Sequence, residues 1–104
     1  QMKDTLAKIV RNSKIMESRD LADKIQKYLV KSLSERYSGV EDLGVRGGPF
    51  WVLIGGEMPS VLVEISHLSN AQEEERLRSP AYRKEVAQGI YSGIIEYMKS
   101  LGKG

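Results

Sequence analysis

Cysteine is absent from the 104-residue chain, and histidine occurs only once, at position 67. Without cysteine the chain can form no disulfide, no thiolate zinc site and no cysteine nucleophile. A single histidine excludes every metal site that takes two histidines from this chain. No apolar run of about 18 residues is present, so no segment is expected to span a membrane. The 16 basic and 14 acidic residues leave a net charge of +2, which gives no reason to predict nucleic acid or an anionic membrane surface as a partner.

What is present suits one small globular domain. Hydrophobic residues make up 40% of the chain and charged residues 29%, which is a globular balance. The length leaves room for a single domain at most. The chain begins at Gln1 without the charged and apolar regions of a signal peptide, so we expect no unprocessed precursor and read no compartment from its start.

Residues 1–38 contain neither proline nor glycine and predict a helix. Their apolar side chains recur at helical spacing, and this stripe shifts register between Ser13 and Asp20. The pattern fits either one long helix or two helices with a break near Ser18, with Gly39 as the end. An unbroken helix would reach about 57 Å, whereas a domain of this size has a radius of gyration of about 13 Å. Such a helix must break or pack on something outside this chain.

Residues 39–70 change character, because glycines separate two short apolar runs. The runs are Pro49–Ile54 and Ser60–Ser66, and both are rich in β-branched or aromatic residues. Their nearly continuous hydrophobicity predicts strands that are buried on both faces of a sheet. The connection Gly55–Pro59 is too short for a parallel crossover, so as neighbours the two strands would be antiparallel.

The last third of the chain predicts two more helices. Ser69 or Asn70 can cap a short helix through residues 73–77, since each has a Gln or Glu three positions later. Ser79 and Pro80 then begin a longer helix, with the serine as cap and the proline at the first helical position.

Gly102 ends this longer helix, and two glycines lie one turn apart in its interior. Gly89 and Gly93 each cost about 1 kcal/mol relative to alanine at such positions. We therefore expect a sheet or another helix to approach closely there, because a close approach would compensate for the loss.

Glu64 is the most informative residue of the second apolar run. Strand alternation places Leu62, Glu64 and Ser66 on one face, so a carboxylate sits near the carboxyl end of an otherwise apolar strand. Burying such a carboxylate without a partner is unfavourable. Two interpretations stay open. One is a structural ion pair, with Arg46 as the candidate cation; the other is a catalytic acid or base beyond the end of a strand, where ligands collect in open α/β sheets.

Other features favour a structural interpretation. His67 suits a strand-end histidine bonded to the backbone better than a metal ligand or proton shuttle, because no second histidine or cysteine accompanies it. Phe50 and Trp51, which could line a cleft, are more typical of a core. The acids at residues 73–75 suit the solvated first turn of a helix rather than a cation site. Gly55-Gly56 lacks the lysine and hydroxyl of a phosphate loop.

The run from Phe50 to Asn70 resembles the zinc-dependent N-acetylmuramoyl-L-alanine amidases of bacterial cell walls. These are the amidase_3 type, similar to the AmiA, AmiB and AmiC group and to the CwlV-like enzymes. The specific part is the string MPSVLVE at residues 58–64 with the later Ser69-Asn70 pair, similar to the family's MPAVLVE and SN. A segment similar to the family's EE..L follows at residues 73–77, and a helix with its spaced tyrosines and glycines follows at residues 82–97.

The resemblance implies a function for Glu64. In the family the glutamate of the LVE string is catalytic, and Glu64 matches it. It would take a proton from a zinc-bound water as general base and deliver it to the leaving amine. The bond cut would be the amide between the lactyl group of N-acetylmuramic acid and L-alanine of the stem peptide. This implies peptidoglycan as the partner and a periplasmic or cell-wall location.

Two departures from the family bear on what this chain does alone. His67 stands where the family usually has an aromatic residue. The family's zinc is held by His, Glu and His from its N-terminal half, and this chain has only one histidine, at a position that is not a ligand in the family. Residues 1–104 are therefore expected to be a single partial domain, the C-terminal half of an amidase catalytic domain, with the zinc ligands outside this chain. The isolated chain is expected to be inactive.

The expected fold class is α/β. The family fold is a mostly parallel sheet flanked by helices. This chain would supply its C-terminal portion: a long N-terminal helix, two strands, a short helix and a C-terminal helix. An exposed sheet edge would invite pairing with a second copy, which predicts a homo-oligomer. The alternative function is a non-catalytic interaction or oligomerisation module, in which the first helix docks a partner and Glu64 is structural.

Overall fold

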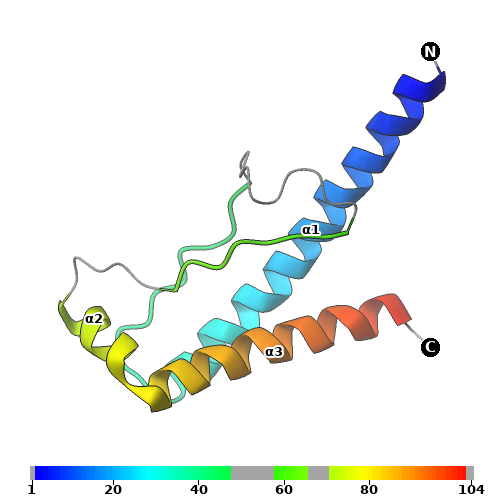
Figure 1. Ribbon diagram of the computed structural model, residues 1–104. Helices are drawn as coiled ribbons and strands as arrows, with labels where there is room; N and C mark the ends of the chain where they lie inside the picture. Colours follow the sequence, from blue (N-terminus) through cyan, green and yellow to red (C-terminus); the bar gives the residue numbers. More distant parts are fainter. Residues whose placement is uncertain (1, 48–57, 66–70, 103–104) are drawn as a thin grey trace.

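The computed structural model describes residues 2–47, 58–65 and 71–102. Its helices, in chain order, are α1 (Met2–Ser34), α2 (Ala71–Arg78) and α3 (Pro80–Gly102). The long helices α1 and α3 form a V, and the short α2 lies at their joined end (Figure 1). The three helical segments expected from the sequence pattern are thereby confirmed. None of the described helices is both long and apolar enough to cross a membrane.

α1 is one unbroken helix, so the break considered near Ser18 does not occur. The helix ends at Ser34 and not at Gly39. The reason is a turn that follows the last helical residue, closed by a hydrogen bond from the Tyr37 N–H to the Leu33 carbonyl oxygen (2.8 Å). Gly39 lies in the connection that follows with a φ of 71°, a left-handed conformation that glycine adopts without strain.

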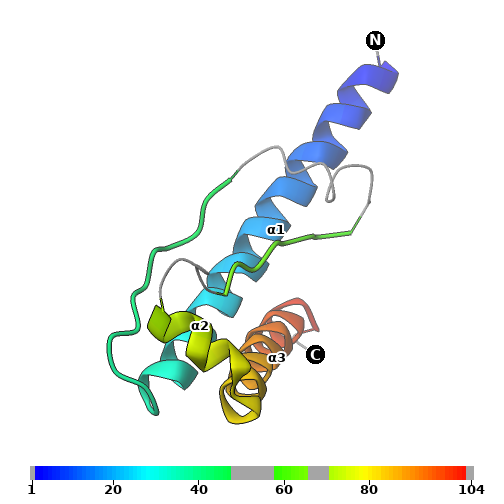
Figure 2. The ribbon, with the colours of Figure 1, turned by 60° about the vertical axis from the view of Figure 1, so that its left-hand side comes forward.

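The N-terminal half of α1 extends past α3, as Figures 1 and 2 both show. Its exposed large apolar side chains are Met2, Leu6, Ile9, Ile15 and Met16. The buried apolar residues of the C-terminal half are Ile25, Leu29 and Leu33. At about 100° per residue, the stripe of residues 2, 6, 9 and 16 is centred about 180° around the helix from that buried set. The register shift seen in the sequence therefore moves most of the apolar stripe to the opposite side of α1, whereas Ile15 stays on the side of the buried set.

The core lies between the C-terminal half of α1 and the inner face of α3. The buried side chains of α3 are Tyr82, Val86 and Tyr97. Gly89 and Gly93 bring the two backbones together. A Cβ at Gly89 would lie 2.8 Å from the Leu29 Cα, and one at Gly93 would lie 2.8 Å from the Ile25 nitrogen. The close approach expected at these glycines is confirmed, and the element that approaches is α1.

α3 begins as the sequence predicts. Ser79 Oγ accepts a hydrogen bond from the Tyr82 N–H (3.3 Å), and Pro80 is the first helical residue. The Tyr82 ring packs edge-on against Tyr37, with 5.0 Å between ring centroids, and the Arg76 guanidinium of α2 lies over the Tyr37 ring. These contacts hold the corner between α2 and α3 against the end of α1.

The α/β prediction is wrong for the part of the chain that the structure describes. Residues 2–47, 58–65 and 71–102 contain helices and extended connections but no strand. Residues 60–65 of the second predicted strand are extended, yet a strand needs a ladder of backbone hydrogen bonds to a neighbour, and they form none with other described residues. The first predicted strand, Pro49–Ile54, lies outside the described residues. The homo-oligomer expected through a sheet edge loses its structural basis with the sheet.

Replacing Gly93 by alanine is expected to destabilise the fold, although alanine is the better helix former. The gain in helix propensity is about 1 kcal/mol. The new Cβ would overlap the Ile25 backbone, which cannot turn aside as a flexible side chain could, and overpacking of this kind costs about 1–3 kcal/mol. Urea unfolding followed by circular dichroism should show a lower free energy of unfolding.

Gly102→Ala is the matched control, because nothing lies within 4 Å of the position where its Cβ would be. This variant should be about as stable as the original chain. A Gly93→Ala chain that is equally stable or more stable would contradict the close approach of α1 and α3.

Candidate active site

Glu64 lies in an extended segment, residues 58–65, that is attached to the helix pair at two points. At the first point the Ser60 N–H donates a hydrogen bond to Ser18 Oγ of α1 (2.9 Å). At the second point Val63 packs against a buried cluster from both long helices, formed by Leu29, Leu33, Tyr82 and Val86. The two attachments fix the start and the middle of the segment against the helices.

The extended conformation turns Glu64 towards solvent. Successive side chains of an extended chain point to opposite sides, so the inward Val63 leaves Glu64 on the outer side. Glu64 and Leu62 are exposed, whereas Val61 and Val63 are half-buried. The expected alternation is present from Val61 to Glu64, whereas Ile65, which should lie on the inner side with Val63, is exposed. The burial expected for Glu64 is wrong, because among the described residues no second layer covers this side of the segment.

No cation is fixed to Glu64 among the residues that the structure describes. Neither the ion pairs nor the side-chain hydrogen bonds found there include Glu64 or the exposed Arg46. The segment before Arg46 is attached to α1 through Asp42, which accepts a hydrogen bond from the Gln26 amide (2.8 Å). Asp42 also accepts one from the Gly44 N–H (2.9 Å), and these two donors lower the pKa of Asp42. An exposed carboxylate without a fixed cation can accept a proton from water, as a general base must.

The structure leaves several sequence candidates outside the described residues: His67, Phe50, Trp51, Ser69, Asn70, Gly55 and Gly56. The acids of residues 73–75 lie at the start of α2, where Glu74 pairs with Arg78 one turn on (2.9 Å). This arrangement agrees with a solvated helix turn. Across residues 2–47, 58–65 and 71–102, no group of three or more His, Asp or Glu side chains is placed to hold a metal ion.

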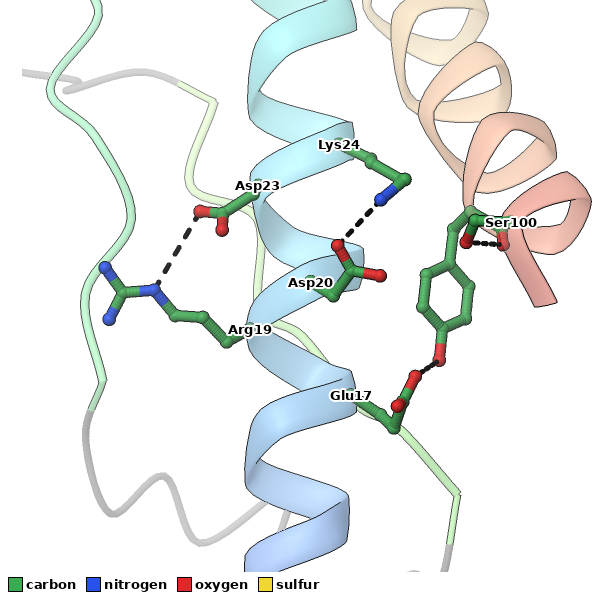
Figure 3. A network of polar contacts seen from close by, with 7 residues as sticks. Glu17, Arg19, Asp20, Asp23, Lys24 and Ser100 are labelled. Carbon is green, nitrogen blue, oxygen red and sulfur yellow. Dashed lines mark hydrogen bonds and ion pairs between the residues drawn. The ribbon is translucent and has the colours of Figure 1, made fainter.

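A polar contact between α1 and α3 was not predicted from the sequence. The Tyr97 hydroxyl donates a hydrogen bond to Glu17 Oε1 (2.7 Å), which is the dashed line that ends on Glu17 in Figure 3. Burial, followed by the hydrogen bond and charge of Glu17, raises the pKa of Tyr97 to about 12. A tyrosine on the core-facing stripe of a helix needs a partner for its hydroxyl, and that rule was the available signal. The contact joins the helices beside Ser18 and is structural.

The sequence is similar to known cell-wall amidases. A family model described as N-acetylmuramoyl-L-alanine amidase matches residues 6–96. The chain is 40% identical over 91 residues, 88% of its length, to an uncharacterized cell wall amidase of Bacillus anthracis. It is 35% identical over 82 residues, 79% of its length, to N-acetylmuramoyl-L-alanine amidase LytC of Bacillus subtilis. A probable N-acetylmuramoyl-L-alanine amidase AmiB of Haemophilus influenzae is 46% identical over 46 residues, 44% of this chain and 11% of that protein.

The matches cover a small share of the longer relatives. The chain spans 16% of the Bacillus anthracis protein and 16% of LytC. No solved structure matches the chain.

Tyr97→Phe is expected to change how stability depends on alkaline pH. The unfolded chain loses the phenolic proton near pH 10, whereas the folded chain retains it up to about pH 12. Between these values the folded state binds more protons, so the free energy of unfolding falls as the pH rises. The variant lacks this part of the fall. Its stability deficit, measured by urea unfolding, should therefore narrow between pH 10 and pH 12.

Tyr91→Phe serves as the control, since Tyr91 is 60% exposed on the outer side of α3. This variant should follow the pH dependence of the original chain. A deficit of Tyr97→Phe that stays constant from pH 10 to pH 12 would rule out the protonated contact with Glu17.

Titration calorimetry of the chain with zinc is expected to show no one-to-one site. A catalytic zinc site takes three protein ligands, and the described residues hold no group that could supply them. His67→Ala is the control, and its heat of titration with zinc should equal that of the original chain. A saturable one-to-one titration would contradict the expectation that the zinc ligands lie outside this chain, and its loss in His67→Ala would identify His67 as a ligand.

Proposed function

Because this chain belongs to the N-acetylmuramoyl-L-alanine amidase family, we propose that it carries the general base of a zinc-dependent peptidoglycan hydrolase. The observation that carries the proposal is the placement of Glu64. This residue ends the MPSVLVE string, its segment is attached to both long helices, and its side chain is exposed without a cation fixed to it among the described residues. The family match over residues 6–96 includes the whole of this segment and supports the assignment.

In the proposed reaction Glu64 moves one proton twice. Its carboxylate takes a proton from the attacking water while the water oxygen bonds to the scissile carbonyl carbon. The carboxyl group then gives this proton to the leaving nitrogen as the C–N bond breaks. One water is consumed, and the products are a carboxylate and a free amine. General acid–base catalysis of this kind contributes about 10²–10⁴-fold in rate.

The substrate is proposed from the relatives. LytC is named as an N-acetylmuramoyl-L-alanine amidase, and we extend that substrate to the protein that carries this chain. The bond cut is then the amide between N-acetylmuramic acid and L-alanine of the stem peptide in peptidoglycan. A periplasmic or cell-wall location goes with this substrate.

Zinc dependence is part of the proposal, but the described residues of this chain do not fit a zinc site. The sequence has one histidine and no cysteine, so it cannot supply both histidines of a His, Glu and His zinc site. We therefore place the zinc ligands outside residues 1–104 and assign these residues to the C-terminal half of the catalytic domain. It follows that the isolated chain is inactive. The 16% coverage of the longer relatives supports this division.

A second candidate function rests on a different observation. The N-terminal half of α1 extends past α3 (Figure 1) and exposes the apolar side chains of Met2, Leu6, Ile9 and Met16. In a non-catalytic interaction module these side chains would dock a partner, and Glu64 would be structural. The two candidates differ in whether Glu64 is needed for turnover.

Glu64→Gln is expected to abolish amidase activity in the full-length gene product. The amide is close in size to the carboxylate but cannot accept the proton of the attacking water, so kcat should fall by about 10²–10⁴-fold. The measurement is the release of free L-alanine amino groups from purified peptidoglycan. Circular dichroism of the same sample should show an unchanged helix content, since Glu64 is exposed and makes no ion pair with the described residues.

Glu41→Gln is the matched control, because Glu41 is also exposed and also lies in a connection outside the helices. It should retain full activity. If Glu64→Gln were as active as Glu41→Gln, the general-base role would be lost and the interaction module would become the better account.

A further inference from the structure

We propose that Ser18 is a positioning residue for Glu64. The inference rests on the proposed function, because Glu64 is the residue that is positioned. Ser18 lies near the middle of α1 and accepts the hydrogen bond of the Ser60 N–H, at the start of the segment that leads to Glu64. Ser18 therefore acts through the backbone of this segment and does not act on the substrate.

The contact meets a need of the backbone at Ser60. This residue is half-buried and belongs to no strand, so its N–H has no ladder partner among the described residues. A backbone N–H that is withdrawn from water without an acceptor is unfavourable. Ser18 Oγ supplies the acceptor at 2.9 Å, a distance typical of N–H···O hydrogen bonds. α1 continues unbroken through Ser18, so only the side chain of this serine is used by the segment.

The segment is stiff at the residue that Ser18 holds. Pro59 fixes its own φ. The Ser60 hydroxyl donates a hydrogen bond back to the Met58 carbonyl oxygen (3.0 Å). Together the Pro59 ring and this hydrogen bond restrict the backbone of residues 58–60. The contact with Ser18 therefore sets the direction in which the chain leaves Ser60.

The packing of Val63 makes that direction matter for Glu64. Val63 rests on the core cluster between the two ends of the segment. Extended backbone covers about 13 Å from Ser60 to Glu64. When the start of the segment is released, the segment can pivot on Val63, and Glu64 moves on the other side of the pivot. The contact at Ser18 opposes this movement.

The helix that carries Ser18 is itself well fixed. The preceding residue, Glu17, accepts the hydrogen bond of the buried Tyr97 of α3 (2.7 Å; Figure 3). Both long helices therefore help to fix the position of Ser60. Ser18 of α1 accepts its hydrogen bond, and Tyr97 of α3 holds the neighbouring Glu17.

The first measurement follows the contact by amide hydrogen exchange at the Ser60 N–H. Ser18→Ala is expected to raise the exchange rate about tenfold, since the amide loses its acceptor. Ser18→Thr retains the hydroxyl and should exchange at nearly the original rate. Ser13→Ala, at an exposed position of the same helix, is the matched control and should leave Ser60 unchanged. An exchange rate that Ser18→Ala does not alter would overturn the proposal.

The second measurement is amidase turnover in the full-length gene product. Ser18→Ala is expected to lower kcat about tenfold with KM unchanged, because a displacement of about 1 Å can cost about 10²-fold. Ser18→Thr is expected to restore kcat. Alanine is a better helix former than serine, and this gain offsets part of the cost of the lost hydrogen bond, so helix content should be unchanged and Tm should change little in Ser18→Ala. A kcat within about twofold of the original, or a loss that accompanies a lower Tm and is not restored by threonine, would overturn the proposal.

Glu64→Gln in the same protein separates the two levels of inference. If Glu64→Gln is inactive and Ser18→Ala is fully active, the general base stands and the positioning role of Ser18 is overturned. If Glu64→Gln is active, the proposed function fails and the positioning role fails with it, whatever the exchange rate at Ser60.

Discussion

Backbone contact between α1 and α3 is the constraint on which the other contacts of the molecule depend. Because Gly89 and Gly93 have no Cβ, α3 can lie directly against the Ile25 and Leu29 backbones. The separation set there brings Glu85 of α3 within reach of the Ser32 hydroxyl (2.9 Å) and the Arg36 guanidinium (3.1 Å) at one end of the contact. At the other end it brings the Tyr97 hydroxyl to Glu17. A wider separation would cost all of these contacts together.

The candidate site is attached to this helix pair without being enclosed by it. Val63 reaches the core cluster and Ser60 reaches Ser18, yet the next side chain, Glu64, projects into solvent. Such a site divides two tasks. The helices determine where the carboxylate is, whereas in the proposed function the groups that exclude water and polarise the substrate come from outside residues 2–47, 58–65 and 71–102. This division agrees with a chain that spans 16% of two longer relatives.

Features that depend on neighbouring residues in the sequence could be predicted. The Ser79–Pro80 start of α3 follows from capping chemistry, and the paired glycines predict a close approach because their cost in a helix needs a compensating contact. The shift in register of the apolar stripe along α1 follows from residue spacing alone. The sequence predicts the end of α1 too late, at Gly39, whereas a hydrogen-bonded turn at Tyr37 already ends the helix.

Features that depend on a distant partner could not be predicted in the same way. An apolar run indicates burial, but a strand also needs a neighbour, and residues 60–65 have none among the described residues. The same lack of a covering layer explains why Glu64 is exposed. No local rule joins Glu17 to Tyr97, since 80 positions separate them in the sequence. The family string identified Glu64 as the candidate base, but nothing in that string names Ser18 as the residue that holds its segment.

The unbroken course of α1 has a consequence for how its length can vary. One apolar face of this helix belongs to the pair with α3, and the other, on the opposite side, belongs to the N-terminal half. Inserting one residue between Ser13 and Asp20 would rotate the first face by about 100° relative to the second, whereas inserting seven would nearly restore it. The number of residues between the two faces therefore sets the angle between them, and an insertion of about two helical turns would preserve that angle.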